Sequence, residues 1–327
     1  PASLINDAPV VFEDSALEST WRPENYSGRF FGPTRLRMGL YKSRNLISVR
    51  LLRSIGIKYV TKFAENFGLK MDELPKDLSL ALGSAELSPL QLSRVFSVFA
   101  NGGYLIEPYL IQRIEDSDGT ILFEADPVVA CPPCLLADRK DDGGSNGSSS
   151  NEVESLGNLP KQAERTLEPR LAFQMNSILQ DVVLRGTARR ALKLNRSDLA
   201  GKTGTTNDQH DAWFNGYTPD LVTTTWVGFD QHKPLGGRET ASKASLPIWI
   251  DYMKIALAGK PERQLERPDG LVTMKIDAIT GEATSRSDIE TEFEIFREEK
   301  APTLDESYEG GPSSNDADAT AIPEQLF

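Results

Sequence analysis

Residues 200–230 read AGKTGTTNDQHDAWFNGYTPDLVTTTWVGFD, and this stretch decides the fold. AWFNGY and LVTTTWVGF are strand-like runs on either side of a Thr-Pro-Asp turn, so they predict an antiparallel hairpin. KTGTT comes directly before the hairpin and is expected as the third strand of the same meander. Strands usually avoid glycine, so the two glycines near Lys202 indicate that a ligand approaches the backbone closely.

Helices are expected in the part of the chain that precedes this stretch. Apolar residues recur every four positions from Ile47 to Ile55, and Gly56 is a typical helix C-cap. A capping box with a proline in the first turn predicts a second helix over residues 88–101, and apolar periodicity predicts a third over residues 171–186. Helices followed by consecutive strands predict an α+β fold, with an antiparallel sheet flanked by helices beside an all-helical subregion.

Composition divides the chain into four expected parts. Residues 137–165 are rich in Gly, Ser and Asp, and residues 298–327 are acidic, so neither segment can offset the entropy cost of ordering, and both are expected to be disordered. Residues 1–136 are expected to form the mainly helical part. Residues 166–297 are expected to hold the sheet, and LVTMKID at 271–277 adds a further strand.

Charge and cysteine content exclude several function classes. The formal net charge of -12 argues against a nucleic-acid partner, because phosphate binding needs a basic stripe. Cys131 and Cys134 lack further zinc ligands in a chain with two histidines, so no metal and no cofactor is expected. The pair is expected to be a disulfide or two structural thiols, with a redox pair as the alternative. No run is long or apolar enough to span a bilayer.

Lys202 is the first candidate site residue. Side chains alternate along a strand, so Lys202 points to one face while the small residues around it leave the backbone open. A substrate carboxylate would meet the hydroxyls of Thr203 and Thr205, and a substrate peptide would pair along the strand edge. The alternative is that Lys202 is a solvated charge that hinders edge-to-edge aggregation.

A second short motif, Ser43-Arg44-Asn45, lies far upstream at a helix start. Ser43 capping its helix, with Asn45 satisfying the same turn, is the alternative to a catalytic role. Ser-x-Asn followed by Lys-Thr-Gly is the order found in penicillin-recognising enzymes, and this order favours the catalytic interpretation.

Other polar and aromatic residues near this strand have simpler explanations. His210 is expected to be a solvated loop histidine rather than a base. Trp213, Phe214 and Trp226 are expected in the sheet core rather than stacked on a substrate.

Longer segments carry a resemblance to a known family. They are MGLYKSRNLISVRLL, LALGSAELSPLQLSRVFSVFANGGYLIEP, VLRGTARRA, the stretch at 200–230 and ASLPIWIDYM, together with ACPPC and the closing QLF. The chain resembles the transpeptidase domain of class A penicillin-binding proteins, the bifunctional murein synthases, most closely the Gram-negative 1a type.

This resemblance implies peptidoglycan D,D-transpeptidation. In this family a serine of a Ser-x-x-Lys motif attacks the D-Ala-D-Ala bond of a stem peptide, and the acyl group passes to an amine of a neighbouring strand. The implied partners are stem peptides, β-lactams and an outer-membrane lipoprotein activator. The implied location is the periplasmic face of the inner membrane, in a parent protein with an anchor helix and a glycosyltransferase domain.

The family's motif residues carry over to both short motifs. Ser43 would relay a proton to the leaving group, and Asn45 would hydrogen-bond the substrate amide and position the catalytic lysine. Lys202 would supply a positive electrostatic potential and attract the substrate carboxylate.

The residues that follow Lys202 are expected to bind the substrate. Thr203 and Thr205 would bind the substrate carboxylate, and Thr206 is grouped with them. The N–H near Thr205 would be half of an oxyanion hole, and Gly204 would let the substrate reach the strand.

The chain departs from the family pattern in one respect. No serine in it is followed three residues later by lysine. We therefore expect the nucleophile and its lysine upstream of Pro1, in a missing N-terminal part, and expect this piece to be inactive alone. The alternatives are a D,D-carboxypeptidase or serine β-lactamase, which hand the acyl group to water, and a catalytically silent binding module.

Overall fold

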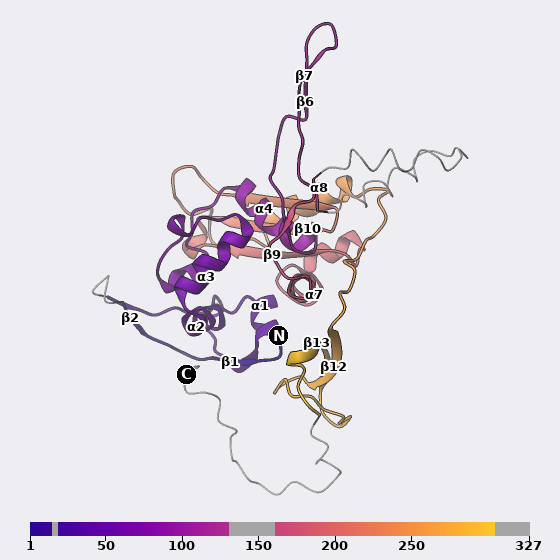
Figure 1. The fold of residues 1–327 in the computed structure, drawn as a ribbon. Helices are drawn as coiled ribbons and strands as arrows, with labels where there is room; N and C mark the ends of the chain where they lie inside the picture. The colour runs from indigo at the N-terminus through magenta and orange to yellow at the C-terminus, as the bar shows by residue number, and fades with distance from the viewer. Residues whose placement is uncertain (15–18, 131–160, 305–327) are drawn as a thin grey trace, which may run out of the picture.

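The computed structural model describes residues 1–14, 19–130 and 161–304, and its centre is a three-stranded antiparallel sheet (Figure 1). The strand order is β11-β10-β9, formed by β9 (Ala200–Thr205), β10 (Ala212–Thr218) and β11 (Leu221–Val227). Thr218 pairs with Leu221, so only two residues connect β10 and β11. The meander predicted from the sequence is confirmed, and within the described residues β9 lies at a sheet edge.

Helix α8 (Ser245–Ala256) covers one face of this sheet. Its Trp249 packs edge-on against Phe214 of β10, with the ring centroids 4.9 Å apart and both side chains fully buried. Burying an aromatic or large aliphatic side chain stabilises a fold by about 1.5–3 kcal/mol. This aromatic pair therefore fixes α8 on the sheet.

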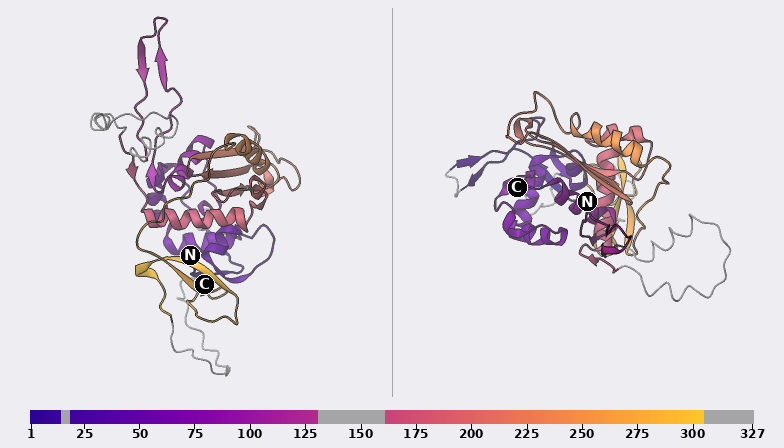
Figure 2. Two further views of the ribbon diagram at one scale, coloured as in Figure 1. Left: turned by 90° about the vertical axis from the view of Figure 1, so that its right-hand side faces the viewer. Right: turned by 90° about the horizontal axis from the view of Figure 1, so that it is seen from above.

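Helices α4 (Pro89–Ala100) and α7 (Pro169–Leu184) cover the opposite face (Figure 2). Phe96 of α4 and Leu179 of α7 pack there against Tyr217 of β10. The sheet is thus enclosed by helices on both faces, which confirms the α+β class.

The expected helix ends agree with the structure. Ser88 and Gln91 form both hydrogen bonds of a capping box at the start of α4, with Pro89 in the first turn. Helix α2 (Asn45–Ile55) ends at Gly56, whose φ of 94° only glycine adopts easily.

The remaining helices and strands lie mostly before α4 or after α8. They are β1 (Leu4–Asp7), β2 (Phe12–Asp14), β3 (Ser19–Trp21), β4 (Gly32–Arg35), α1 (Leu36–Tyr41), α3 (Ile57–Ala64), β5 (Tyr104–Leu105), β6 (Arg113–Glu115), β7 (Ile121–Glu124), β8 (Glu164–Arg165), β12 (Leu271–Asp277) and β13 (Thr291–Arg297), with 3-10 helices at Glu65–Phe67, Met71–Glu73, Leu78–Leu82, Arg189–Leu194, Asn207–Gln209 and Glu298–Lys300. Strands β1 to β7, which no sequence pattern predicted, are only two to four residues long.

Two segments expected to be disordered are partly ordered. Residues 161–165 include β8, which pairs with β5, and Ala163 is buried. Residues 298–304 begin with a 3-10 helix, and Ala301 packs on the apolar cluster of the β12–β13 hairpin. Main-chain pairing, the buried Ala163 and the half-buried Ala301 stabilise segments whose composition is otherwise polar. The rest of both expected segments lies outside the described residues, as do Cys131 and Cys134.

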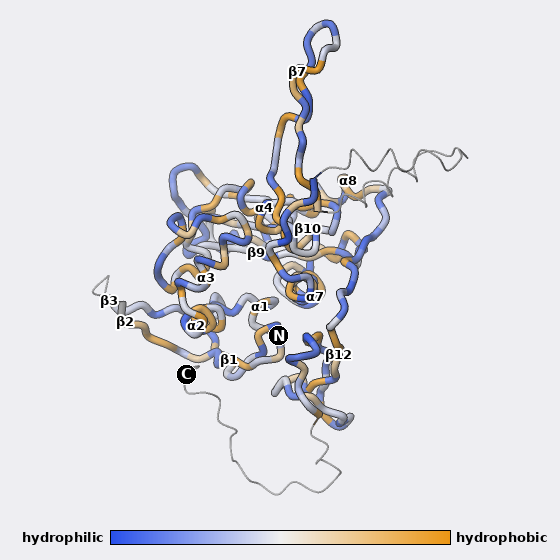
Figure 3. Tube along the Cα trace, viewed as in Figure 1, coloured by the Kyte–Doolittle hydropathy of each residue, from blue (hydrophilic) through white to orange (hydrophobic). Residues whose placement is uncertain are grey.

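The β6–β7 hairpin and the β12–β13 hairpin lie outside the central sheet (Figures 1 and 3). β6 and β7 project outward, and their Ile114, Ile121, Leu122 and Phe123 are exposed. β12 and β13 lie instead beside α7 and the start of the chain (Figure 2). None of the helices in the described part of the chain is long and apolar enough to cross a membrane.

Candidate active site

Ser43 occupies a strained turn between α1 and α2. Its φ is 56°, in the left-handed region where glycine is usual. The N–H of Ser43 donates to the Leu40 carbonyl at 3.0 Å, and the N–H of Arg44 donates to the Gly39 carbonyl at 2.8 Å. These two bonds form a Schellman motif, which closes α1 and orients the Ser43 side chain. A serine held in this conformation at such a cost is typical of a functional position.

Lys202 of β9 reaches this turn from the sheet. Its Nζ lies 2.8 Å from Ser43 Oγ and 2.8 Å from the carbonyl oxygen of Thr203. Ser43 and Lys202 are 159 residues apart in the sequence. The structure therefore brings together the first residue of each of the two short motifs.

The amino group of Lys202 is held in a desolvated position. Burial lowers its pKa from 10.5 to about 8, and among the residues that the structure describes no carboxylate offsets this effect. At neutral pH the group is still mostly protonated, but it gives up a proton more easily than an ordinary lysine does. A solvated edge charge would keep an ordinary pKa, so this position favours the site interpretation of Lys202 over the edge-charge alternative.

The two glycines of β9 serve different purposes. A Cβ at Gly201 would lie 2.6 Å from the Asn215 carbonyl oxygen, so a side chain there would push β9 and β10 apart. A Cβ at Gly204 would approach only Trp213, at 3.3 Å, on the face that carries Lys202. Gly201 is thus needed for sheet pairing, whereas Gly204 leaves space beside Lys202.

Thr203 and Thr205 lie on the face of β9 opposite Lys202. Thr203 Oγ1 is 2.8 Å from Thr187 Oγ1, and Thr205 Oγ1 accepts the N–H of Ala241 at 3.0 Å. A hydroxyl offers one donor and two acceptor positions, so each threonine keeps hydrogen-bonding capacity for a ligand. Their role in carboxylate binding stays a prediction.

Thr206 and Asn45 hold local backbone in place. Thr206 Oγ1 accepts the N–H of Asp211 at 2.8 Å, which closes the loop after β9. Asn45 Nδ2 donates to the carbonyl of Glu24 at 2.8 Å. The structure thus gives Asn45 a partner outside the two motifs, and its contact with a substrate amide stays a prediction.

Residues 186–187, which were not among the predicted site residues, join the two halves of the site. Thr187 contacts Thr203 of β9, and a Cβ on Gly186 would lie 2.4 Å from the carbonyl oxygen of Tyr41, just before the Ser43 turn. These residues belong to VLRGTARRA, one of the segments that carry the family resemblance, and this membership was the signal in the sequence that could have indicated them. Residues 186–187 therefore bridge the turn and the strand.

Asn215 is a second missed residue. It pairs with Lys202 in the sheet, faces the same side and is buried, and its Oδ1 accepts a hydrogen bond from Thr224 Oγ1 at 2.8 Å. Strand alternation relative to Lys202 was enough to place it on this face.

Two expectations for nearby rings were wrong. Trp226 is 37 % exposed because it lies near the end of β11, an edge strand of the sheet; it pairs with Trp213 at 5.8 Å and donates through Nε1 to Asp211. His210 is half-buried and stacks on His232 with a centroid distance of 4.0 Å, so it is not simply solvated. Phe214 lies in the core, as predicted.

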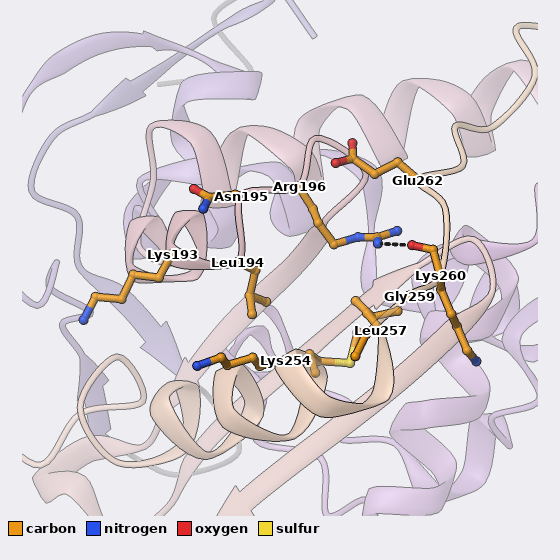
Figure 4. Close-up of a pocket in the computed structure, with 11 residues that line it drawn as sticks. Lys193, Leu194, Asn195, Arg196, Lys254, Leu257, Gly259, Lys260 and Glu262 are labelled. Carbon is orange, nitrogen blue, oxygen red and sulfur yellow. Dashed lines mark hydrogen bonds between the residues drawn. The ribbon is translucent and has the colours of Figure 1, made fainter.

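A pocket elsewhere in the molecule shares no residue with the predicted site. It lies between the 3-10 helix at residues 189–194 and α8, with Lys193 and Lys254 in its lining (Figure 4). Arg196 donates there to the Lys260 carbonyl at 2.8 Å. Over the described ranges, no three or more His, Cys, Asp or Glu side chains are grouped so that they could hold a metal ion.

Comparison with known proteins matches this arrangement to one family. The family model for the penicillin binding protein transpeptidase domain matches residues 3–254. Penicillin-binding protein 1A of Pseudomonas aeruginosa is 44% identical over 347 residues, covering 100% of this chain and 42% of that protein. Penicillin-binding protein 1A of Escherichia coli strain K12 is 36% identical over 357 residues, covering 95% and 42%. The chain thus spans about two fifths of the length of these curated relatives.

Solved structures show the same fold. The crystal structure of penicillin-binding protein 1A from Haemophilus influenzae superposes with a TM-score of 0.79 at 37% identity, covering 92% of this chain and 45% of that chain. PonA1 from Mycobacterium tuberculosis, with a TM-score of 0.60 at 20% identity, shows the likeness of the fold alone. The chain belongs to the penicillin-binding protein transpeptidase domain family, and its similar relatives are the 1A proteins of Gram-negative bacteria.

Proposed function

We propose that the chain is part of a serine-type peptidoglycan D,D-transpeptidase that cross-links D-Ala-D-Ala stem peptides and is acylated by β-lactams. The observation that carries this proposal is the 2.8 Å hydrogen bond between Lys202 Nζ and Ser43 Oγ. It unites the Ser-x-Asn and Lys-Thr-Gly motifs at a lysine whose pKa is lowered to about 8 by burial.

The direction of this hydrogen bond fits proton delivery. A lysine ammonium has donors only, so Ser43 Oγ accepts from it and keeps its own O–H to donate outward. When the stem peptide is cleaved, the C–N bond of the terminal D-Ala breaks and its nitrogen must gain a proton. The nucleophilic serine bonds to the acyl carbon as the C–N bond breaks, and its own proton would pass to its lysine, while Ser43 supplies the proton of the leaving nitrogen and Lys202 replaces it. The acyl group then stays on the nucleophilic serine until an acceptor amine attacks.

The free edge of β9 supports peptide binding beside this relay. Within the described residues β9 pairs only with β10, so an extended stem peptide would add along its other edge. Thr205 is exposed at the end of the strand, where its hydroxyl would donate to the substrate carboxylate. Asn45, Thr203 and Thr206 would complete the binding surface.

The family resemblance extends the proposal to the parent protein. We infer that the nucleophile and its lysine in a Ser-x-x-Lys motif, a glycosyltransferase domain and an N-terminal anchor helix lie upstream. The parent would then act at the periplasmic face of the inner membrane, with an outer-membrane lipoprotein as its activator. This chain alone would form no acyl-enzyme.

A fluorescent penicillin tests the proposal. The chain is incubated with the label, and so is a polypeptide extended upstream, and adducts are read by denaturing gel and intact mass. We expect an adduct only on the extended protein. An adduct on the chain alone would identify a different nucleophile and would overturn the proposal that the nucleophile lies upstream. Supplying an amine acceptor then distinguishes the transferase, which gives a cross-linked product, from a carboxypeptidase or β-lactamase, which gives only hydrolysis.

A further inference from the structure

The hairpin β12–β13 places a buried carboxylate under the start of α1. Glu294 of β13 has no exposed surface, and its two oxygens accept from Arg37 Nε at 2.7 Å and Arg37 Nη2 at 2.6 Å. The remaining Arg37 Nη1 donates to Asp181 of α7 at 2.9 Å. The guanidinium is therefore held by carboxylates on two separate elements.

A second carboxylate of the same strand is linked to both ends of α1, directly through Arg35 at its N-cap and indirectly through Arg185 at its last residue. Glu292 lies two residues from Glu294, on the same face of β13, and accepts from Arg35 at 2.5 Å and from Arg185 at 2.7 Å. The Arg185 guanidinium lies over the ring of Tyr41, 4.9 Å from the ring centroid. The carbonyl oxygen of Arg185 accepts a hydrogen bond from Lys42 Nζ at 3.0 Å. Tyr41 and Lys42 immediately precede Ser43.

The charges in this cluster are balanced and mutually dependent. Arg35, Arg37 and Arg185 face Glu292, Glu294 and Asp181, and Asp181 also accepts from Arg185 at 2.8 Å. Burial alone would lower the pKa of Arg37, but its hydrogen bonds to Glu294 and Asp181 outweigh that effect and raise it. Removing one partner leaves an uncompensated buried charge, so the cluster holds one arrangement of α1.

Fixing α1 matters because the turn after it is strained. Ser43 has a left-handed backbone, which persists in a residue other than glycine only where the surroundings define it fully. α1 is six residues long, too short to be rigid by itself. Its start is held through Arg37, and its end through Tyr41 and Lys42.

We propose that Glu292 and Glu294 are positioning residues for the Ser43 turn, so that the β12–β13 hairpin contributes to the activity of the transpeptidase site. The family match ends at residue 254, and both glutamates lie beyond it. This inference rests on the proposed function of Ser43. The glutamates act through α1 and touch no reacting atom.

The test measures the rate constant of β-lactam acylation in the full-length parent protein. Glu294→Gln and Glu292→Gln remove one charge each with little change in shape, and Glu292, at 23 % side-chain exposure, is the substitution that the fold tolerates more easily. We expect each to slow acylation on the order of tenfold or more, because small misplacements of reacting groups are costly. Ile276→Val, in the fully buried core of the same hairpin, is the control for destabilisation without charge loss.

A double-mutant cycle separates positioning from general destabilisation. If the glutamates act through Ser43, adding Glu294→Gln to Ser43→Ala slows acylation by less than about threefold beyond Ser43→Ala alone. The inference would be overturned if the double variant were slowed by the product of the two single effects, or if both glutamine variants reacted at the rate of Ile276→Val. Either result would leave the role of Ser43 unchanged. Ser43→Ala at the wild-type rate would overturn the proposed function together with this inference. Should Glu294→Gln fail to fold, the same cycle with Glu292→Gln decides.

Discussion

The two halves of the site are built by different physical means. Lys202 lies in a regular strand whose position follows from sheet register, and its amine hydrogen-bonds to uncharged oxygens. Ser43 lies in a strained turn after α1, a helix that buried ion pairs hold, and one of these pairs joins residues 257 apart in the sequence. One half is therefore encoded locally, and the other depends on a distant part of the chain. The site forms only where the two halves meet.

Substituting Lys202 should give the largest effect. In the full-length parent, Lys202→Met keeps the length of the side chain and removes the amine. We expect β-lactam acylation to slow by roughly 10²–10⁴-fold, the usual contribution of a positioned proton-transfer group. Unfolding stability at pH 7 should not fall, because a desolvated charge is removed, and calorimetry of the domain's transition checks this. A variant that loses stability along with activity would show that Lys202 is a structural residue.

The pH dependence of stability should sharpen the same contrast. Lys202 titrates near 8 when folded and near 10.5 when unfolded. Its destabilising effect is therefore complete below pH 8, and the wild type should gain stability relative to Lys202→Met as pH rises from 8 toward 10.5, by roughly 3 kcal/mol over the whole window. Unfolding of both proteins at several pH values measures the difference. A difference that does not change with pH would contradict the desolvated position of Lys202.

The two glycines of β9 should separate structure from function within one strand. Gly201→Ala should destabilise the domain by about 1–3 kcal/mol, because its Cβ meets the backbone of β10. Gly204→Ala should cost less stability yet slow acylation, because its Cβ occupies space beside Lys202. Melting temperatures and acylation rates of the two variants test this, and a reversed pattern would place the substrate elsewhere.

The smallest expected effect concerns the strained turn. Ser43→Gly and Ser43→Ala both remove the hydroxyl, but only glycine relieves the left-handed backbone. The glycine variant should be more stable than the alanine variant by about 1 kcal/mol, while both slow acylation equally. Thermal unfolding and acylation rates together check the pair. Equal stabilities would show that the turn is not strained.

Local patterns in the sequence predicted the half of the site that carries Lys202. Alternating apolar residues and a short turn were sufficient for the meander, and the capping box at Ser88 was sufficient for α4. Lys202, Gly204 and Asn215 then share one face by strand alternation alone.

The support of Ser43 could not be predicted in the same way. Strand β13 reads TEFEIFR, in which the alternation of Phe293 and Ile295 with Glu292 and Glu294 suggests that Phe293 faces the core, yet Phe293 is 74 % exposed and Glu294 is fully buried. The glutamate faces inward because Arg37 of α1 lies there, and nothing near residue 294 in the sequence indicates that arginine. Asn45 likewise contacts Glu24, a partner that only the folded chain brings to it.

The most direct test of the account asks whether Ser43 and Lys202 act as one unit. The acylation rate constant is measured in the full-length parent for the wild type, Ser43→Ala, Lys202→Met and the double variant. Because the two side chains share one proton relay, we predict that the double variant reacts within about threefold of the slower single variant. A double variant slowed by the product of the two single effects would show that Ser43 and Lys202 act independently, and would contradict the account.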